Sequence, residues 1–201
     1  MNGDLKNKVV LITGAGKGAG RMLAEACAER GAIIAANDVS PVNVDEVVST
    51  IYARGGNARS YIEDVAKKVG VQVLVKSVED ELGGIDVLIY HAEVQPRASL
   101  LDMDEWDWHR VLDVNLTGAF LALQSVGRVM REKNRGVIII ITARADQSLE
   151  KDAAAYLSSK AGLVALTHQA DRELNPHGIR VYGVENSSSV VEDVMAILEA
   201  Q

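Results

Sequence analysis

The sequence predicts an α/β protein with a doubly wound parallel sheet of about six strands and helices on both faces. Three observations predict this class. Short runs of branched apolar residues alternate with segments of helical periodicity along nearly the whole chain. Each intervening segment is long enough for a helical crossover, which makes successive strands parallel. The most apolar run, residues 136–141, is too uniformly hydrophobic to have one face in water.

The expected elements follow one another without an internal repeat or a proline-rich linker. Ser40 and Pro41 predict a helix start, because serine caps first-turn amides and proline fits the first helical position. Glycines predict several helix ends. We expect strands at residues 8–13, 32–38, 58–62, 85–90, 136–142 and 178–184. We expect helices at residues 19–30, 41–54, 66–82, 104–114, 116–133, 153–174 and 189–200.

Length and composition predict one globular domain over residues 1–201, with 48% hydrophobic and 24% charged residues. The net charge of -7, spread over scattered acids, argues against nucleic acid or an anionic membrane as a partner. The longest apolar runs have the length of a strand rather than of a membrane-spanning helix. The sequence does not begin with the basic segment and apolar centre of a cleavable signal peptide, so we expect a cytoplasmic protein. Cys27 is the single cysteine, and we expect a core thiol without a catalytic role.

A glycine-rich turn, "TGAGKGAG", follows the first expected strand at residues 13–20. Glycine permits a tight turn and a close approach of backbone amides to a pyrophosphate, and the following helix adds a partial positive charge. Such a turn also has a purely steric explanation, but its place between a strand and a helix favours a dinucleotide site. The candidate cofactor-binding residues here are Gly14, Lys17, Gly18, Ala19 and Gly20.

Asp38 ends the second expected strand, where a carboxylate accepts both hydroxyls of an adenosine ribose and repels a 2'-phosphate. Lys17 argues the other way, because a lysine beside the turn attracts a 2'-phosphate. We favour NAD over NADP. The alternative for Asp38 is an Asx turn or helix cap ahead of Ser40. Asp64 and Val65, after the third strand, are expected near the adenine, with a cap of the next helix as the alternative for Asp64.

Tyr156 and Lys160 are four residues apart in the helix expected at 153–174, so they lie on one face and can share a cleft. A free tyrosine has a pKa of ~10, and a neighbouring ammonium favours the phenolate, which suits proton exchange near neutral pH. The alternative is an ordinary pair on an amphipathic helix.

Three motifs, in this order and spacing, resemble the short-chain dehydrogenases/reductases: "TGAGKGAG", "DVNLTGAF" with Asn115, and "YLSSK" with Tyr156 and Lys160. The resemblance covers residues 8 to 184. It implies a nicotinamide cofactor and a small alcohol or carbonyl substrate, with Tyr156 as the acid/base. It also implies that Lys160 holds the nicotinamide ribose and that Asn115 supports a proton-relay water. The alternative for Asn115 is an N-cap of the following helix.

The sequence departs from the family pattern where a serine should polarise the substrate carbonyl, because Ala143 stands there. A methyl group donates no hydrogen bond, and loss of such a donor costs a factor of about 10² to 10³ in turnover. Thr142 is the nearest hydroxyl, but adjacent strand residues point to opposite faces. Ser148 would substitute only if its loop folds back.

A second departure follows the fourth strand, where the family's Asn-Asn-Ala-Gly is replaced by residues 90–93, "YHAE". Ala92 is retained as a candidate cofactor contact. Glu93 adds bulk and negative charge near the expected pyrophosphate and ribose, which opposes cofactor binding. His91 is either a donor or acid, or a strand-end histidine bonded to backbone. A metal site at His91 and Glu93 lacks further ligands at suitable spacing, so we expect no metal.

The late part of the chain departs as well. The family's Pro-Gly after the sixth strand is replaced by Glu185 and Asn186, and we expect the substrate-loop region and the last strand to be absent from this domain. The helices at 116–133 and 153–174 resemble those that pair subunits in the family, which predicts a homodimer or homotetramer; ordinary core contacts are the alternative. Trp106 and Trp108 fall in a helix that resembles the family's "EW" segment, and we expect them to pack rather than to stack on a base.

Two functions remain open at this point. The first is an NAD(P)-dependent oxidoreductase that moves a hydride between a nicotinamide and an alcohol or carbonyl substrate, with Tyr156 exchanging the proton. The second is a catalytically impaired or silent nucleotide-binding or assembly protein derived from this family. Ala143, Glu93 and the missing Pro-Gly motivate the second function.

Overall fold

A six-stranded, fully parallel sheet forms the centre of the molecule. A computed structural model describes residues 5–143 and 151–200 of the chain. The strand order is β3-β2-β1-β4-β5-β6, so the winding reverses between β1 and β4. The strands are β1 (Val9–Thr13), β2 (Ile33–Asn37), β3 (Asn57–Tyr61), β4 (Val87–Tyr90), β5 (Gly136–Thr142) and β6 (Ile179–Glu185).

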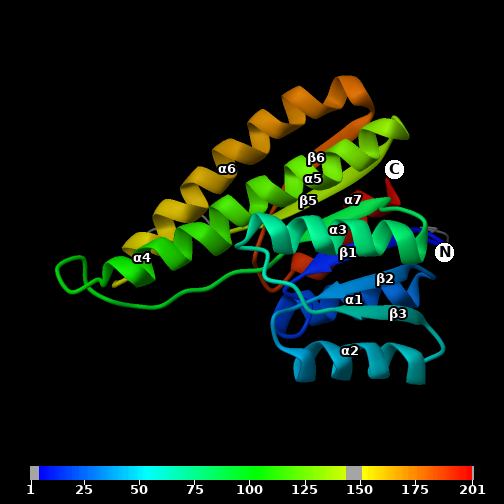
Figure 1. Cartoon of the computed structure of the whole chain (residues 1–201), viewed down its shortest axis with the longest axis horizontal. Helices are drawn as coiled ribbons and strands as arrows, with labels where there is room; N and C mark the ends of the chain where they lie inside the picture. Colours follow the sequence, from blue (N-terminus) through cyan, green and yellow to red (C-terminus); the bar gives the residue numbers. More distant parts are fainter. Residues whose placement is uncertain (1–4, 144–150, 201) are drawn as a thin grey trace.

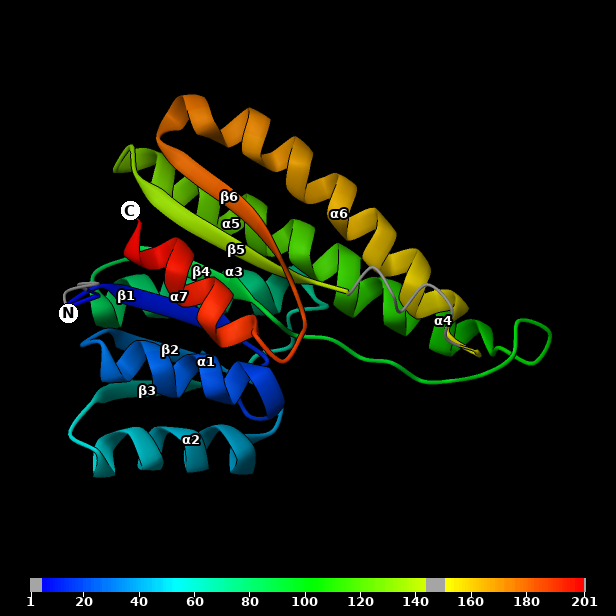
Figure 2. The same cartoon turned by 180° about the vertical axis from the view of Figure 1, so that it is seen from behind.

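Helices cover both faces of this sheet (Figures 1 and 2). The first face carries α1, α2 and α7, and the second carries α3, α5 and α6. The α-helices are α1 (Gly18–Glu29), α2 (Pro41–Ala53), α3 (Lys68–Leu82), α4 (Glu105–Leu112), α5 (Gly118–Glu132), α6 (Ala154–Leu174) and α7 (Val190–Glu199). No helix among the described residues is both long and apolar enough to cross a membrane.

Alternation along the strands divides the core into two layers. Val10 and Ile12 of β1 pack with the first group of helices, whereas Val9 and Leu11 pack with the second group. Both sets are buried because successive strand side chains point to opposite faces and each face is covered. The continuous hydrophobic runs of the sequence therefore belong to strands with no face in water, as predicted.

The expected break between the helices at 104–114 and 116–133 is wrong. α4 continues into α5 through a π-helical turn, Asp113–Thr117, and Asn115 lies inside this turn. Asn115 is therefore not an N-cap. Its buried side chain is hydrogen-bonded to the loop that follows β4, and a π-helical turn is a common way to orient a side chain at a functional site.

The carboxyl ends of β1 and β4 are joined where the winding reverses. The Thr13 Oγ1 accepts hydrogen bonds from the backbone amides of His91, at 3.1 Å, and Ala92, at 3.2 Å. Beyond Ala92, a long connection extends away from the sheet before α4 begins (Figure 2). This end of the sheet is where doubly wound proteins bind ligands, so the functional site is expected there.

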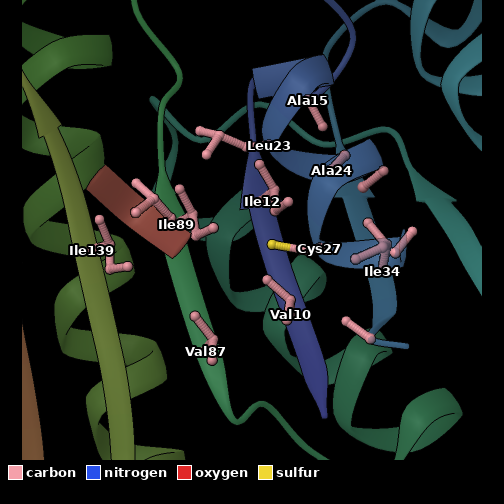
Figure 3. Close-up of a cluster of buried hydrophobic side chains, with 14 of the residues drawn as sticks. Val10, Ile12, Ala15, Leu23, Ala24, Cys27, Ile34, Val87, Ile89 and Ile139 are labelled. Atoms are coloured by element: carbon pink, nitrogen blue, oxygen red, sulfur yellow. The ribbon is translucent and has the colours of Figure 1, made fainter. Parts of the chain in front are cut away.

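Cys27 lies in the middle of the first layer, among Val10, Ile12 and Ile34 (Figure 3). Burial raises the pKa of its thiol to about 12. Because the thiolate is the reactive form, we expect iodoacetamide at pH 8 to modify Cys27 about 100-fold more slowly in the native protein than in denaturant. Mass spectrometry measures both rates. Equal rates would show that the thiol is exposed and would contradict this packing.

Candidate active site

The glycine turn between β1 and α1 is shaped by close backbone contacts. Gly14 and Gly18 have φ angles of +66° and +53°, which side chains disfavour. A Cβ atom on Gly14 would lie 2.8 Å from the Ala92 Cα, and one on Gly20 would lie 2.1 Å from the Gly14 carbonyl oxygen. Lys17 precedes α1 as its N-cap without a side-chain capping bond. The first-turn amides of α1 are therefore placed to bind an anion such as a pyrophosphate.

The Asp38 carboxylate accepts backbone hydrogen bonds from the glycine turn and from its own loop. Its Oδ2 accepts from the Gly16 amide at 3.0 Å, and its Oδ1 accepts from the Ser40 amide at 2.9 Å. The hydrogen bond to the Ser40 amide forms the Asx turn that was the alternative interpretation of Asp38. Asp38 also lines a cavity, so this turn does not exclude a role in binding. Gly16 was not identified as a site residue from the sequence. A Cβ atom there would lie 2.7 Å from the Asp38 Oδ2, and the run of alternating glycines is the signal that marks it.

The cavity has a volume of about 650 Å³ and lies beyond the carboxyl ends of the strands. The loops after β1 to β4 supply one part of its wall, including Gly14, Asp38, Asp64 and Val65. The Asp64 Oδ1 accepts from the Ala66 amide at 3.0 Å, in a turn that precedes α3. The N-cap of α3 is a later residue, Lys67, so the helix-cap alternative for Asp64 is wrong.

Helix α4 and the π-helical turn that follows it supply the other part of the cavity wall. Trp106, His109 and Arg110 line it, and sequence reasoning did not assign them to the site. Trp106 is 65% exposed, and the Arg110 guanidinium carbon lies 5.2 Å from the centroid of its ring. The expectation that Trp106 is a packed side chain is therefore wrong. The charged and aromatic stretch "EWDWHR" after the long loop is the sequence signal for this wall.

His91 is packed under the glycine turn. Its Nδ1 lies 3.2 Å from the Gly14 carbonyl oxygen, and burial lowers the pKa of the imidazole. A neutral imidazole with an Nδ1–H donor fits this contact. His91 is therefore bonded to the backbone, as in the second interpretation of its role, and is not placed as a free acid.

Tyr156 and Lys160 lie on one face of α6, deep beside the end of β5. They are 2% and 4% exposed, and the Lys160 Nζ lies 5.5 Å from the centroid of the tyrosine ring. The Nζ donates a hydrogen bond of 3.1 Å to the Ile141 carbonyl oxygen. A buried ammonium needs a charged partner, because desolvation costs more than one neutral acceptor returns.

Glu93 is that partner. Its Oε2 lies 2.7 Å from the Lys160 Nζ and accepts a hydrogen bond of 3.2 Å from the Tyr156 hydroxyl. Its Oε1 accepts a hydrogen bond of 3.3 Å from the Asn186 Nδ2. Two positions at which the sequence departs from the family pattern, Glu93 and Asn186, therefore meet at the tyrosine and lysine that the pattern retains.

Asn115 fixes the loop that carries Glu93. Its Oδ1 accepts from the Val94 amide at 2.9 Å, and its Nδ2 donates to the Val94 carbonyl oxygen at 3.1 Å. The Nδ2 also donates to the Ser159 Oγ, which in turn donates to the Tyr156 carbonyl oxygen. Asn115 thus connects the loop after β4 to the backbone of α6 at Tyr156. Ser159 was missed from the sequence, although it lies within the "YLSSK" motif.

The position expected to polarise a substrate carbonyl provides no hydroxyl. Ala143 is half-buried directly after β5. The neighbouring Thr142 is buried, and its Oγ1 donates to the Val184 carbonyl oxygen of β6 at 3.2 Å, so this hydroxyl is committed to the sheet. Ser148 lies outside the described residues.

The fold and this site define a nucleotide-binding oxidoreductase class of the Rossmann type, with a glycine turn at the switch point and a Tyr/Lys pair beside it. The sequence profile described as short chain dehydrogenase matches residues 8–194. The chain belongs to the short-chain dehydrogenase/reductase family.

Relatives and solved structures agree with this assignment. An uncharacterized oxidoreductase of Thermotoga maritima is 34% identical over 98% of this chain and 78% of its own length. A 3-oxoacyl-[acyl-carrier-protein] reductase of Synechocystis is 36% identical over 90% of this chain and 73% of its own length. The structure of a metagenomic short-chain oxidoreductase in complex with NADP superposes with a TM-score of 0.91. It is 30% identical, and the match covers 98% of this chain and 92% of that one.

The pair of Glu93 and Lys160 should be measurable as a coupling free energy. Removing one partner leaves a charge that is poorly solvated, and the Glu93 side chain is 24% exposed, so we expect a coupling of about 1–3 kcal/mol. Urea unfolding of wild type, Glu93→Gln, Lys160→Met and the double variant measures it. A coupling below about 0.3 kcal/mol would contradict the contact.

Proposed function

We propose that the protein is an NAD-dependent oxidoreductase acting on a small alcohol or carbonyl substrate. The observation that carries the proposal is the placement of Tyr156 and Lys160 on one face of α6, where both contact Glu93, a residue that lines the cavity at the glycine turn. Similarity to a dehydrogenase of known cofactor supports it. One matched structure, 35% identical with a TM-score of 0.86, is an NAD+-bound xylitol dehydrogenase, and it covers 90% of this chain and 70% of that one.

The residues at the glycine turn fit the adenosine and diphosphate parts of such a cofactor. The first-turn amides of α1 have no side-chain cap from Lys17, and a Cβ atom on Gly18 would meet no heavy atom of the described residues within 4 Å, so the turn is open at this point. We assign the diphosphate to Gly14, Lys17, Gly18, Ala19 and Gly20, the adenosine to Asp38, Asp64 and Val65, and a further contact to Ala92. The bound nicotinamide would supply the position that gives or takes the hydride.

Tyr156 is assigned the proton transfer. In reduction its hydroxyl gives a proton to the carbonyl oxygen, and in oxidation the phenolate takes the proton from the alcohol. The Lys160 ammonium favours the phenolate when it is close to the ring and is not neutralised. Asn115 is a positioning residue, because it holds the loop after β4 against the α6 backbone at Tyr156.

Asp38 carries the preference for NAD over NADP. Its carboxylate lines the cavity, and its two backbone hydrogen bonds fix it there. A 2'-phosphate beside this carboxylate would meet repulsion between like charges. Lys17 is exposed at the start of α1, where its charge is screened by water.

We also propose self-association through α5 and α6, as a homodimer or homotetramer. A groove of about 460 Å³ lies between these helices, and Leu123, Leu166 and Leu174 are among its lining residues. Phe120, which also lines it, and Val164 of α6 are exposed. Exposed apolar side chains along a groove are typical of a surface that another subunit covers.

The proposed mechanism is tested by turnover. We expect oxidation of NADH, above that of NADPH, with at least one substrate in a panel of aldehydes, ketones and 3-oxo esters. Tyr156→Phe should lower the rate by a factor of about 10² to 10⁴, because a phenyl ring transfers no proton. Absorbance at the reduced nicotinamide band measures the rates. Equal rates for wild type and Tyr156→Phe would exclude Tyr156 as the acid, and a complete lack of turnover with bound cofactor would favour the catalytically silent alternative.

Ala143 gives an independent test of the same site. Ala143→Ser adds a hydroxyl after β5 that can donate to a substrate carbonyl, so turnover should rise by a factor of about 10 or more without a matching change in KM for NADH. Ala153→Ser, at the buried residue before α6, is the control for a serine added elsewhere. An unchanged rate for Ala143→Ser would show that this position does not contact the reacting carbonyl.

A further inference from the structure

Glu93 separates the cavity from the tyrosine and lysine. Its side chain is part of the cavity wall, together with Gly14 and Asp38. Among the described residues that form this wall, neither Tyr156 nor Lys160 occurs, and both are almost fully buried. A ligand that extends from the glycine turn therefore meets the Glu93 carboxylate before it reaches the phenol or the ammonium.

Among the described residues, three donors from two distant segments hold the carboxylate in this place. The Lys160 ammonium and the Tyr156 hydroxyl lie at its Oε2, and the Asn186 amide lies at its Oε1. A hydrogen bond between an ammonium and a carboxylate is about twice as strong as a neutral one. A neutral ribose hydroxyl or carbonyl oxygen is thus a weaker partner for Lys160 than the one it already has.

The glycine-turn side of the cavity shows no such competition. Among the described residues, the donors to the Asp38 carboxylate are the backbone amides of Gly16 and Ser40, and the first turn of α1 lacks a side-chain cap from Lys17. An adenosine diphosphate group can therefore bind here without breaking an ion pair. A cofactor would therefore have to displace the Glu93 carboxylate from Lys160 in one half of the proposed site, but would break no ion pair among the described residues at the glycine turn.

We propose that Glu93 is a specificity-determining residue that divides the nucleotide site into two parts. The part at the glycine turn binds an adenine nucleotide directly. The part at Tyr156 and Lys160 accepts the second nucleoside of a dinucleotide only when the Glu93 carboxylate leaves Lys160. This inference rests on the proposed function. It follows that the nicotinamide half adds little to the binding of the resting protein, so an adenine mononucleotide and the dinucleotide bind with similar affinity.

The test compares ADP with NADH by isothermal titration calorimetry on the full chain. For the wild type we expect Kd values within about threefold of each other, because the second half of NADH must break the Lys160 pair. In Glu93→Gly, NADH should bind about tenfold more tightly than in wild type, whereas the Kd of ADP should stay within about twofold. The tenfold change corresponds to about 1.4 kcal/mol.

Two further variants separate charge from volume. Glu93→Gln keeps the size of the side chain and removes its charge, so it should show most of the gain for NADH. Glu63→Gln changes another acidic residue of the cavity wall. In the part of the chain that the structure describes, the ion pair of Lys160 is with Glu93 and not with Glu63, so this variant should leave the ratio of the two Kd values unchanged. A gain in Glu93→Gly that is missing from Glu93→Gln, or an equal shift in Glu63→Gln, would overturn the role of this ion pair.

The ratio of the Kd values of ADP and NADH for the wild type tests the proposal even if a variant fails to fold. NADH binding more than about tenfold tighter than ADP to the wild type would overturn it and leave the proposed function intact. Weaker NADH binding in Glu93→Gly would also overturn it, because Glu93 would then be an acceptor for the cofactor. Failure of both ligands to bind the wild type and every folded variant would instead refute the proposed nucleotide site itself.

Discussion

The buried ammonium of Lys160 is the constraint around which the site is arranged. An unpaired cation at this depth would cost several kcal/mol, so the surroundings must supply acceptors. The end of β5 supplies the Ile141 carbonyl oxygen, and the loop after β4 supplies Glu93. The same carboxylate then binds Tyr156 and Asn186, which brings α6 and the segment after β6 to one point.

The sheet makes this convergence possible. All six strands are parallel, so the carboxyl ends of β1, β4, β5 and β6 lie at the same edge of the sheet. Thr13 binds the backbone after β4 to the end of β1, and Asn115 binds the next part of that loop to α6. The loop therefore has a fixed path between the glycine turn and the tyrosine helix. Glu93 lies on this path, where the family pattern has glycine.

The fold could be predicted from the sequence because its signals are local. Uniformly apolar runs indicated buried strands, and Ser40 with Pro41 indicated a helix start, which the Ser40 Oγ makes by accepting from the Asn43 amide. The π-helical turn at Asn115 could not be predicted, since it depends on a side-chain contact with Val94, which lies in a loop without periodicity. Several strands and helices begin or end a few residues away from the expected positions. Tertiary contacts help to decide where each element stops, and a local sequence pattern does not contain them.

The site could be predicted only in part. The glycine turn and the spacing of Tyr156 and Lys160 are sequence patterns, and a negative charge at Glu93 was expected to oppose the cofactor. Its partner was not predicted, because the ion pair with Lys160 joins two residues that are distant in the sequence. The sequence also left the Thr142 hydroxyl as a possible donor, whereas register with β6 commits it to Val184.

Retention of the tyrosine and lysine does not by itself fix what the site can bind. In this chain the electrostatic state of Lys160 depends on a carboxylate that a ligand must displace. The most direct measurement is a crystal structure of the nucleotide-free protein at a resolution that places side-chain atoms. We expect the Lys160 Nζ to lie within hydrogen-bond distance of both the Glu93 carboxylate and the Ile141 carbonyl oxygen. A Glu93 side chain directed into solvent, with the Lys160 ammonium bound to other groups, would contradict it.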